Sequence, residues 1–187
     1  GDYGCDIAVA EGQCLGNPMN FGGPYLGLLS CREEFVRKIP GRLVGQTVDR
    51  NSKRCWVLTL QTREQHIKRE KATSNICTAQ VLLSVMAGLY ATYHGPEGLK
   101  NIAKRIHALT STLATELSKN GFAVQNKSWF DTIRIQTADA AEIKIKAESM
   151  GMNFRYPEAG LISISLDETT DLDALKKILE LFHKNLN

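Results

Sequence analysis

The sequence has no long hydrophobic run, no clustered cysteines and no glycine-rich nucleotide signature. No window approaches the ~18 consecutive apolar residues that a membrane-spanning helix needs. The first residues, Gly1-Asp-Tyr-Gly4, lack the basic and apolar regions of a signal peptide. We therefore expect no membrane association. Because the chain has no initiating methionine and opens close to an apparent strand, we also expect it to be a piece of a longer protein.

The five cysteines all lie within the first 77 residues and form no close pair. Their odd number and wide separations fit neither a disulfide framework nor a tetrahedral zinc site. The sequence thus predicts reduced thiols in a cytosol-like compartment and no bound metal.

The composition is that of a folded globular protein, with 43% hydrophobic and 23% charged residues. The net charge is only +3, but residues 50–71 hold seven Lys or Arg against two Glu, whereas residues from Asp139 onward hold nine acidic against six basic residues. A basic stretch can bind nucleic acid, yet such sites interleave basic residues with aromatics, and only Trp56 is available. We therefore rank a nucleic-acid-binding module low and expect no nucleic-acid partner.

Two short apolar segments near the start have the pattern of strands. Residues 6–10 form an apolar run bounded by Gly4 and Gly12, which is consistent with a buried strand of a parallel sheet, and residues 25–30 predict another. The loop between them is rich in Gly, Asn and Pro and permits close backbone approach to a ligand or subunit. Two strands cannot complete a doubly wound sheet, so most of that sheet is expected to lie outside the chain.

The middle of the chain predicts helices. Residues 33–38 form a short amphipathic pattern stopped by Pro40, and residues 57–60 read as a strand. A long helix is expected to begin near Ser74 or Asn75 and to run to Gly95. A second helix begins at Pro96 and is ended by Asn120-Gly121.

The last third predicts an α+β unit. Strands are expected at residues 122–125, 130–136, 152–155 and 161–166, with Ile133 and Ile135 facing inward. Helices are expected at residues 140–150 and from the capping pattern Thr170-Asp-Leu-Asp173 to Leu186. This order describes a small sheet covered on one side by helices.

Three polar or glycine-rich segments, at residues 11–27, 40–45 and 59–77, closely resemble the P-protein of the glycine cleavage system. The match is to the C-terminal stretch of the first half or subunit, which does not carry the cofactor lysine. The resemblance implies an α/β, fold-type I transferase-like fold dependent on pyridoxal phosphate (PLP). Residues 1–73 would be the truncated end of the large domain with an interface loop, 74–120 inter-domain helices, and 121–187 a C-terminal α+β small domain.

The resemblance also implies the activity. The complete enzyme decarboxylates glycine with pyridoxal phosphate and passes the aminomethyl group to the lipoylated H-protein. A covalent cofactor site needs a lysine, but none lies between Asp6 and Phe21, and the first is Lys38. The cofactor is therefore expected on the other, catalytic half, which this chain pairs with and whose active site it completes. The chain alone is expected to be inactive, and its location to be bacterial cytoplasm, or mitochondrial matrix in a eukaryote.

The resemblance places Thr73, Ser74 and Asn75 at the partner's cofactor phosphate. Hydroxyls, an amide and the free N–H groups of a helix start suit a phosphate dianion. The alternative is that Ser74 and Asn75 only cap the helix.

The part of residues 59–77 that precedes Thr73, which we call the polar run, is a candidate contact for the acidic H-protein or the glycine carboxylate. Arginine can hold a carboxylate through two parallel hydrogen bonds. The alternative is a solvated loop in which Glu64 and Glu70 neutralise their neighbours. The candidate residues are Arg63, Gln65, His66, Lys68 and Arg69.

An alternative to the P-protein is another fold-type I lyase, such as a cysteine desulfurase. Such an enzyme shares the small-domain pattern, but residues 63–67 and 72–77 favour the P-protein.

The glycine-rich segment Phe21-Gly-Gly-Pro24 lacks the spacing of a dinucleotide-binding or phosphate-binding loop. Its glycines are expected to allow a tight turn against a partner subunit.

A truncated sheet should expose strand edges and apolar surface. We therefore predict that the isolated chain associates.

Overall fold

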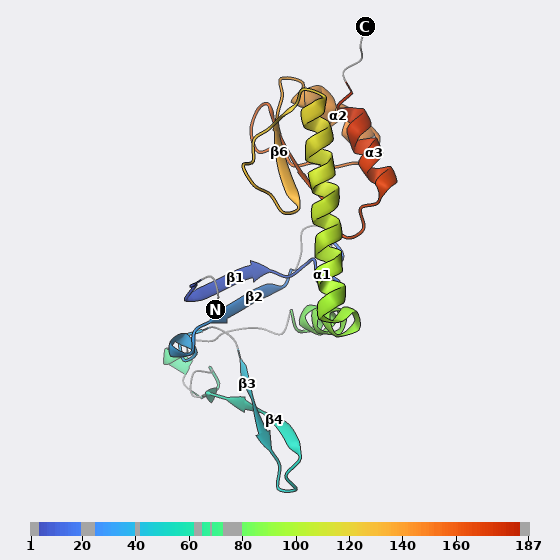
Figure 1. Cartoon of the computed structure of the whole chain (residues 1–187). Helices are drawn as coiled ribbons and strands as arrows, with labels where there is room; N and C mark the ends of the chain where they lie inside the picture. Colours follow the sequence, from blue (N-terminus) through green and yellow to red (C-terminus); the bar gives the residue numbers. More distant parts are fainter. Residues whose placement is uncertain are drawn as a thin grey trace. The chain divides into compact units, whose positions relative to one another are not determined.

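The computed structural model describes residues 4–19, 25–39, 42–61, 65–67, 69–72 and 80–183 (Figure 1). It is a mixed α/β structure whose chain divides into two compact units, Gly1–Tyr93 and His94–Asn187. The two units are described in turn.

The first unit opens with an antiparallel hairpin of β1 (Ile7–Glu11) and β2 (Gly27–Cys31). Both strands were expected, but the expectation that they lie buried in a parallel sheet is wrong. They pair with each other, and Ile7 and Val9 are more than half exposed. An apolar run specifies a strand, whereas its pairing and burial depend on the partner surfaces available to it.

A second hairpin pairs β3 (Leu43–Val48) with β4 (Arg54–Thr59). Its turn is held by the Asp49 carboxylate, which accepts hydrogen bonds from the backbone N–H groups of Asn51 at 2.7 Å and Lys53 at 2.9 Å. The strand expected at residues 57–60 therefore begins earlier, and β3 was not expected because glycine and glutamine interrupt its apolar pattern.

Short 3₁₀ turns connect these hairpins to the rest of the unit. The helix expected at residues 33–38 is only a single turn, η1 (Glu33–Phe35), since a segment this short gains too few hydrogen bonds to offset helix nucleation. A second turn, η3 (Arg69–Lys71), lies in the polar run.

The helical segment α1 (Val81–Lys119) is two helices joined at Gly95, whose φ of 62° and ψ of 178° are non-helical. Pro96 follows directly, and this confirms the expected break. The second helix ends at Gly121, with a φ of 82°, where the Phe122 N–H donates to the Leu117 carbonyl at 3.0 Å. The expected start near Ser74 or Asn75 lies outside the described residues.

The second unit contains a three-stranded antiparallel sheet in the order β5 (Ala123–Val124), β6 (Thr132–Gln136), β7 (Leu161–Ser165). Ile133 and Ile135 are fully buried, as the alternation predicted. The strand expected at residues 152–155 is reduced to one bridge, between Arg155 and Ser163.

The hydrophobic core of this unit lies between one face of the sheet, the second half of α1, α2 (Ala140–Ser149) and α3 (Leu172–Leu181) (Figure 1). Phe122 and Phe182 meet edge to face, with ring centroids 5.1 Å apart. The expected sheet with helices on one side is thereby confirmed. The buried cluster comprises Leu109, Leu113, Ala114, Leu117, Phe122, Ile133, Ile135, Ala140, Ile143, Ala147, Ile162, Ile164, Leu166, Leu175, Ile178, Leu181 and Phe182.

Candidate functional site

The loop that follows β1 is a tightly bonded turn. The Glu11 carboxylate accepts hydrogen bonds from the backbone N–H groups of Gln13 at 2.8 Å and Leu26 at 3.0 Å. The Gly12 N–H donates to the Leu26 carbonyl at 2.6 Å. These contacts fix residues 11–17, which we call the Gly-Asn turn, against the start of β2.

Gly16 lets the Gly-Asn turn pack on the first helix of α1. Its φ of 80° lies in the left-handed region, and an added Cβ would meet the Cδ2 atom of Tyr90 at 2.9 Å. Only glycine combines that backbone conformation with so close an approach. The tight turn against a partner subunit was expected of the glycines in Phe21-Gly-Gly-Pro24, and residues 21–24 lie outside the described residues, so that expectation stays a prediction.

Asn17 closes the turn and carries an unsatisfied amide. Its side chain is only 7% exposed, and neither Oδ1 nor Nδ2 has a hydrogen-bond partner among the residues that the structure describes. Its backbone is tied to Gln13, whose Nε2 donates to the Asn17 carbonyl at 2.5 Å. Buried amides without partners are rare because they forfeit their hydrogen bonds to water. Sequence reasoning did not single out Asn17, and only its position beside Pro18 in a glycine-rich loop could have indicated it.

The polar run is described only in part. Gln65, His66 and Arg69 are exposed, and none of them has a hydrogen bond or ion pair within the described residues. Arg63 and Lys68 lie outside those residues. Contact of the three exposed side chains with a partner stays a prediction.

The expected phosphate contacts, Thr73, Ser74 and Asn75, also lie outside the described residues. The fit of pyridoxal phosphate to this chain is therefore tested on its amines. Covalent attachment requires a lysine Nζ in an enclosed site, but Lys38, the first lysine, is exposed just after η1. The other lysines that the structure describes are exposed as well, so the described residues do not fit a covalently held cofactor.

The first unit exposes many large apolar side chains. On the β3–β4 hairpin, Trp56 is 60% exposed, and the Arg54 guanidinium lies 5.8 Å from its ring centroid. Exposed apolar side chains in such number are typical of a protein that contacts other protein. On both hairpins and the first helix of α1, the exposed large apolar residues are Ile7, Val9, Leu28, Leu29, Val44, Val48, Trp56, Val57, Leu58, Val81, Leu82, Val85, Leu89 and Tyr93.

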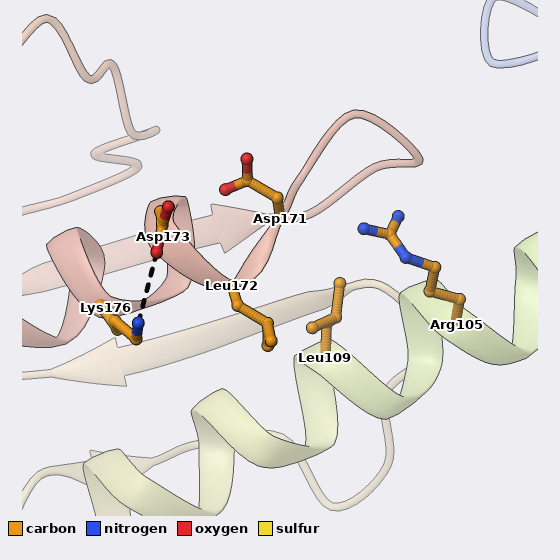
Figure 2. Close-up of a pocket in the computed structure, with 6 residues that line it drawn as sticks. All are labelled: Arg105, Leu109, Asp171, Leu172, Asp173 and Lys176. Carbon is orange, nitrogen blue, oxygen red and sulfur yellow. Dashed lines mark hydrogen bonds and ion pairs between the residues drawn. The ribbon is translucent and has the colours of Figure 1, made fainter.

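The second unit has an open groove of about 610 Å³ at the start of α3 (Figure 2). The Arg105 guanidinium donates to the carbonyls of Glu168 at 2.9 Å and Thr170 at 2.7 Å. The Asp171 carboxylate accepts from the Ala174 N–H at 2.7 Å, and Lys176 pairs with Asp173 at 3.3 Å. These polar groups form hydrogen bonds and an ion pair that hold the loop before α3, so we interpret the groove as a structural feature and not as a ligand site.

The same loop holds a perturbed carboxyl group. Burial acts to raise the pKa of Asp167, but hydrogen bonds from the side chains and backbone N–H groups of Thr169 and Thr170 outweigh it and lower the pKa. The carboxylate accepts from the Thr169 hydroxyl at 2.7 Å and from the Thr169 N–H at 2.9 Å. The group is thus kept ionised to organise the loop.

Metal and membrane sites find no support in the part of the chain that the structure describes. No cluster of three or more His, Cys, Asp or Glu residues there could hold a metal ion. Among the same residues, no helix combines the length and hydropathy that crossing a bilayer requires. The four described cysteines, Cys5, Cys14, Cys31 and Cys55, form no disulfide with one another.

Comparison with known proteins identifies the family. The model of the glycine cleavage system P-protein family matches residues 1–182. The glycine dehydrogenase (decarboxylating) of Cupriavidus metallidurans is 49% identical over 183 residues, covering 97% of this chain and 19% of that protein. The same enzyme of Nostoc sp. is 50% identical over 184 residues, covering 97% of this chain and 19% of that protein.

A solved structure agrees. A crystal structure of glycine decarboxylase (P-protein) of the glycine cleavage system, in inhibitor-bound form, matches 96% of this chain and 43% of its own with a TM-score of 0.85 and 35% identity. This chain spans about a fifth of the length of the curated relatives it matches. The chain therefore belongs to the P-protein family of the glycine cleavage system, the glycine dehydrogenases (decarboxylating).

Proposed function

We propose that this chain is part of the first half of a glycine dehydrogenase (decarboxylating) and completes a pyridoxal-phosphate site whose lysine belongs to the other half. One observation carries the proposal: the family match extends through residue 182, yet the first lysine is an exposed residue after η1. Among the residues that the structure describes, every lysine is exposed and none is suited to hold the cofactor, so the chain is inactive without its partner half.

The apolar surface of the first unit supports a role in a larger assembly. The core cluster lies in the second unit, whereas the hairpins and the first helix of α1 leave large apolar residues exposed. Remaining parts of a P-protein are the partners that such a surface suits. The fold-type I assignment, with boundaries at residues 1–73, 74–120 and 121–187, belongs to the same proposal.

The segment at residues 73–75 is proposed to contact the cofactor phosphate across the boundary between the halves. Bound cofactor is to be measured by absorbance after gel filtration of a complete P-protein that contains this chain. Thr73→Ala and Ser74→Ala should each reduce the retained pyridoxal phosphate. The control is Ser84→Ala, which removes an exposed hydroxyl that donates only to the Val81 carbonyl, at 2.7 Å. Retention equal to the control in both variants would remove the phosphate role.

The polar run is proposed to receive the lipoylated H-protein, while glycine is the small substrate. Gln65, His66 and Arg69 are exposed and make no ion pair or hydrogen bond with any other described residue, which suits a contact with an acidic surface. Arg63→Gln and Arg69→Gln should raise the KM for H-protein several-fold, more at low salt, with little change in kcat. Arg50→Gln, at the hairpin turn, is the matched control. If the KM values of Arg63→Gln and Arg69→Gln for H-protein equal that of Arg50→Gln at every ionic strength, the proposed contact is contradicted.

A further inference from the structure

Three polar residues lie in one row across the sheet of the second unit. Arg134 on β6 is the register partner of Ser163 on β7. Ser163 in turn bridges to Arg155, with backbone hydrogen bonds of 2.8 and 3.1 Å in the two directions. Adjacent strands are about 4.8 Å apart, so the two arginine backbones flank Ser163 at roughly 10 Å from each other.

The alternation of each segment places all three side chains on the face away from the core. On β6, Ile133 and Ile135 are fully buried on either side of Arg134. The neighbours of Ser163 and Arg155 also face the core, because side chains alternate along an extended chain. Ile162 and Ile164 on either side of Ser163 are buried in the core, and Phe154 and Tyr156 on either side of Arg155 pack against it.

The Ser163 hydroxyl is an accessible, unpaired group on this face. The residue as a whole is only 8% exposed, and its hydroxyl has no hydrogen-bond partner in the described residues. The fully buried unpaired side-chain atoms of the described residues belong to Asn17 and Tyr156, so the Ser163 oxygen keeps contact with solvent. The hydroxyl is therefore free to donate to a bound group.

The two positive charges are not neutralised by neighbours. Neither Arg134 nor Arg155 takes part in an ion pair within the described residues, and both are exposed. Like charges on one side of a sheet repel each other unless an anion lies between them.

We propose that Arg134, Arg155 and Ser163 form an anion-binding site for a carboxylate or phosphate group. Each planar guanidinium can present two parallel N–H donors to such a group, and the serine hydroxyl adds a third contact point. The anion comes either from solution or from an acidic side chain elsewhere in a complete P-protein. The inference rests on this sheet alone and does not depend on the proposed function.

The test uses a complete P-protein that contains this chain. Inorganic phosphate and succinate are titrated by calorimetry at constant ionic strength, and melting temperatures are recorded for Arg134→Gln, Arg155→Gln, the double variant and Ser163→Ala. Lys104→Gln, which removes an exposed, unpaired charge from α1, is the matched control. Circular dichroism confirms that each variant is folded.

Two outcomes support the site and distinguish its sources. Saturable binding to wild type and control that weakens at least tenfold in each arginine variant identifies a free anion. A carboxylate within the protein is identified by a different set of results. The wild type then binds no added anion, and each arginine variant melts at a lower temperature than the control. The double variant lowers the melting temperature by less than the sum of the two single changes. Anion binding unchanged in the arginine variants, or no binding together with melting temperatures equal to or above the control, overturns the proposal.

Discussion

Gly16 and Asn17 are neighbours in the Gly-Asn turn but have opposite effects on its stability. Gly16 supplies a left-handed backbone and room for the Tyr90 ring. Asn17 contributes a buried amide that the chain leaves unpaired. The first feature stabilises the turn, whereas the second costs stability and is therefore a candidate for function.

Asn17→Leu should stabilise the isolated chain. Leucine has a similar volume and removes the unsatisfied amide, so the free energy of unfolding should rise by about 1–2 kcal/mol. If the amide serves the other half of the enzyme, the same change should lower cofactor retention in the assembled P-protein. Denaturant unfolding and cofactor absorbance measure the two effects, with the exposed Asn101→Leu as control. A loss of stability at Asn17 would show that its amide is satisfied in solution.

Asp167 gives the second unit a component of stability that depends on pH. Its pKa is lowered from the ordinary value of 3.8 in the folded state, so the ionised form favours folding. The stabilisation is fully present above that ordinary value and is lost as the pH falls through the folded pKa. Asp167→Asn should lower the free energy of unfolding by about 1 kcal/mol at pH 7. It should also reduce the fall of the free energy of unfolding that the wild type shows as the pH becomes acidic. A fall identical to that of the wild type would contradict the role.

At the scale of elements, periodic segments were predicted well and pairing was not. The helices at residues 96–120 and 140–150 and the strand with Ile133 and Ile135 follow from apolar spacing and from glycine or proline stops. The pairing of β1 with β2 and the existence of β3 depend on contacts that a local pattern does not encode. For the same reason, the buried Asn17 amide is visible only once the turn is folded.

The start of α3 provides a sharp element-level prediction. The Asp171 carboxylate caps the helix by accepting from the Ala174 N–H at 2.7 Å, one residue after Thr170, where the Thr170-Asp-Leu-Asp173 pattern placed the cap. Asp171→Ala should therefore lower the free energy of unfolding by about 1 kcal/mol. Asp173→Ala loses only an exposed pair with Lys176 and should change it by less than about 0.5 kcal/mol. Equal effects in denaturant titrations would remove the capping account.

At the scale of the whole molecule, the exposed apolar surface of the first unit predicts association of the isolated chain. Light scattering should show a mass that rises with concentration, and Trp56→Ser should reduce the rise because Trp56 is 60% exposed on its hairpin. Leu172→Ser, which removes an exposed leucine at the start of α3, is the control. A monomer at high concentration would contradict the prediction.

The central claim is that this chain shapes a cofactor site without holding the cofactor. The most direct test is borohydride reduction of an active P-protein that contains this chain, followed by peptide mass spectrometry to locate the lysine linked to pyridoxal phosphate. The account predicts that the label lies entirely on a lysine of the catalytic half, outside these residues. A label on Lys38 or on any other lysine of this chain would contradict it.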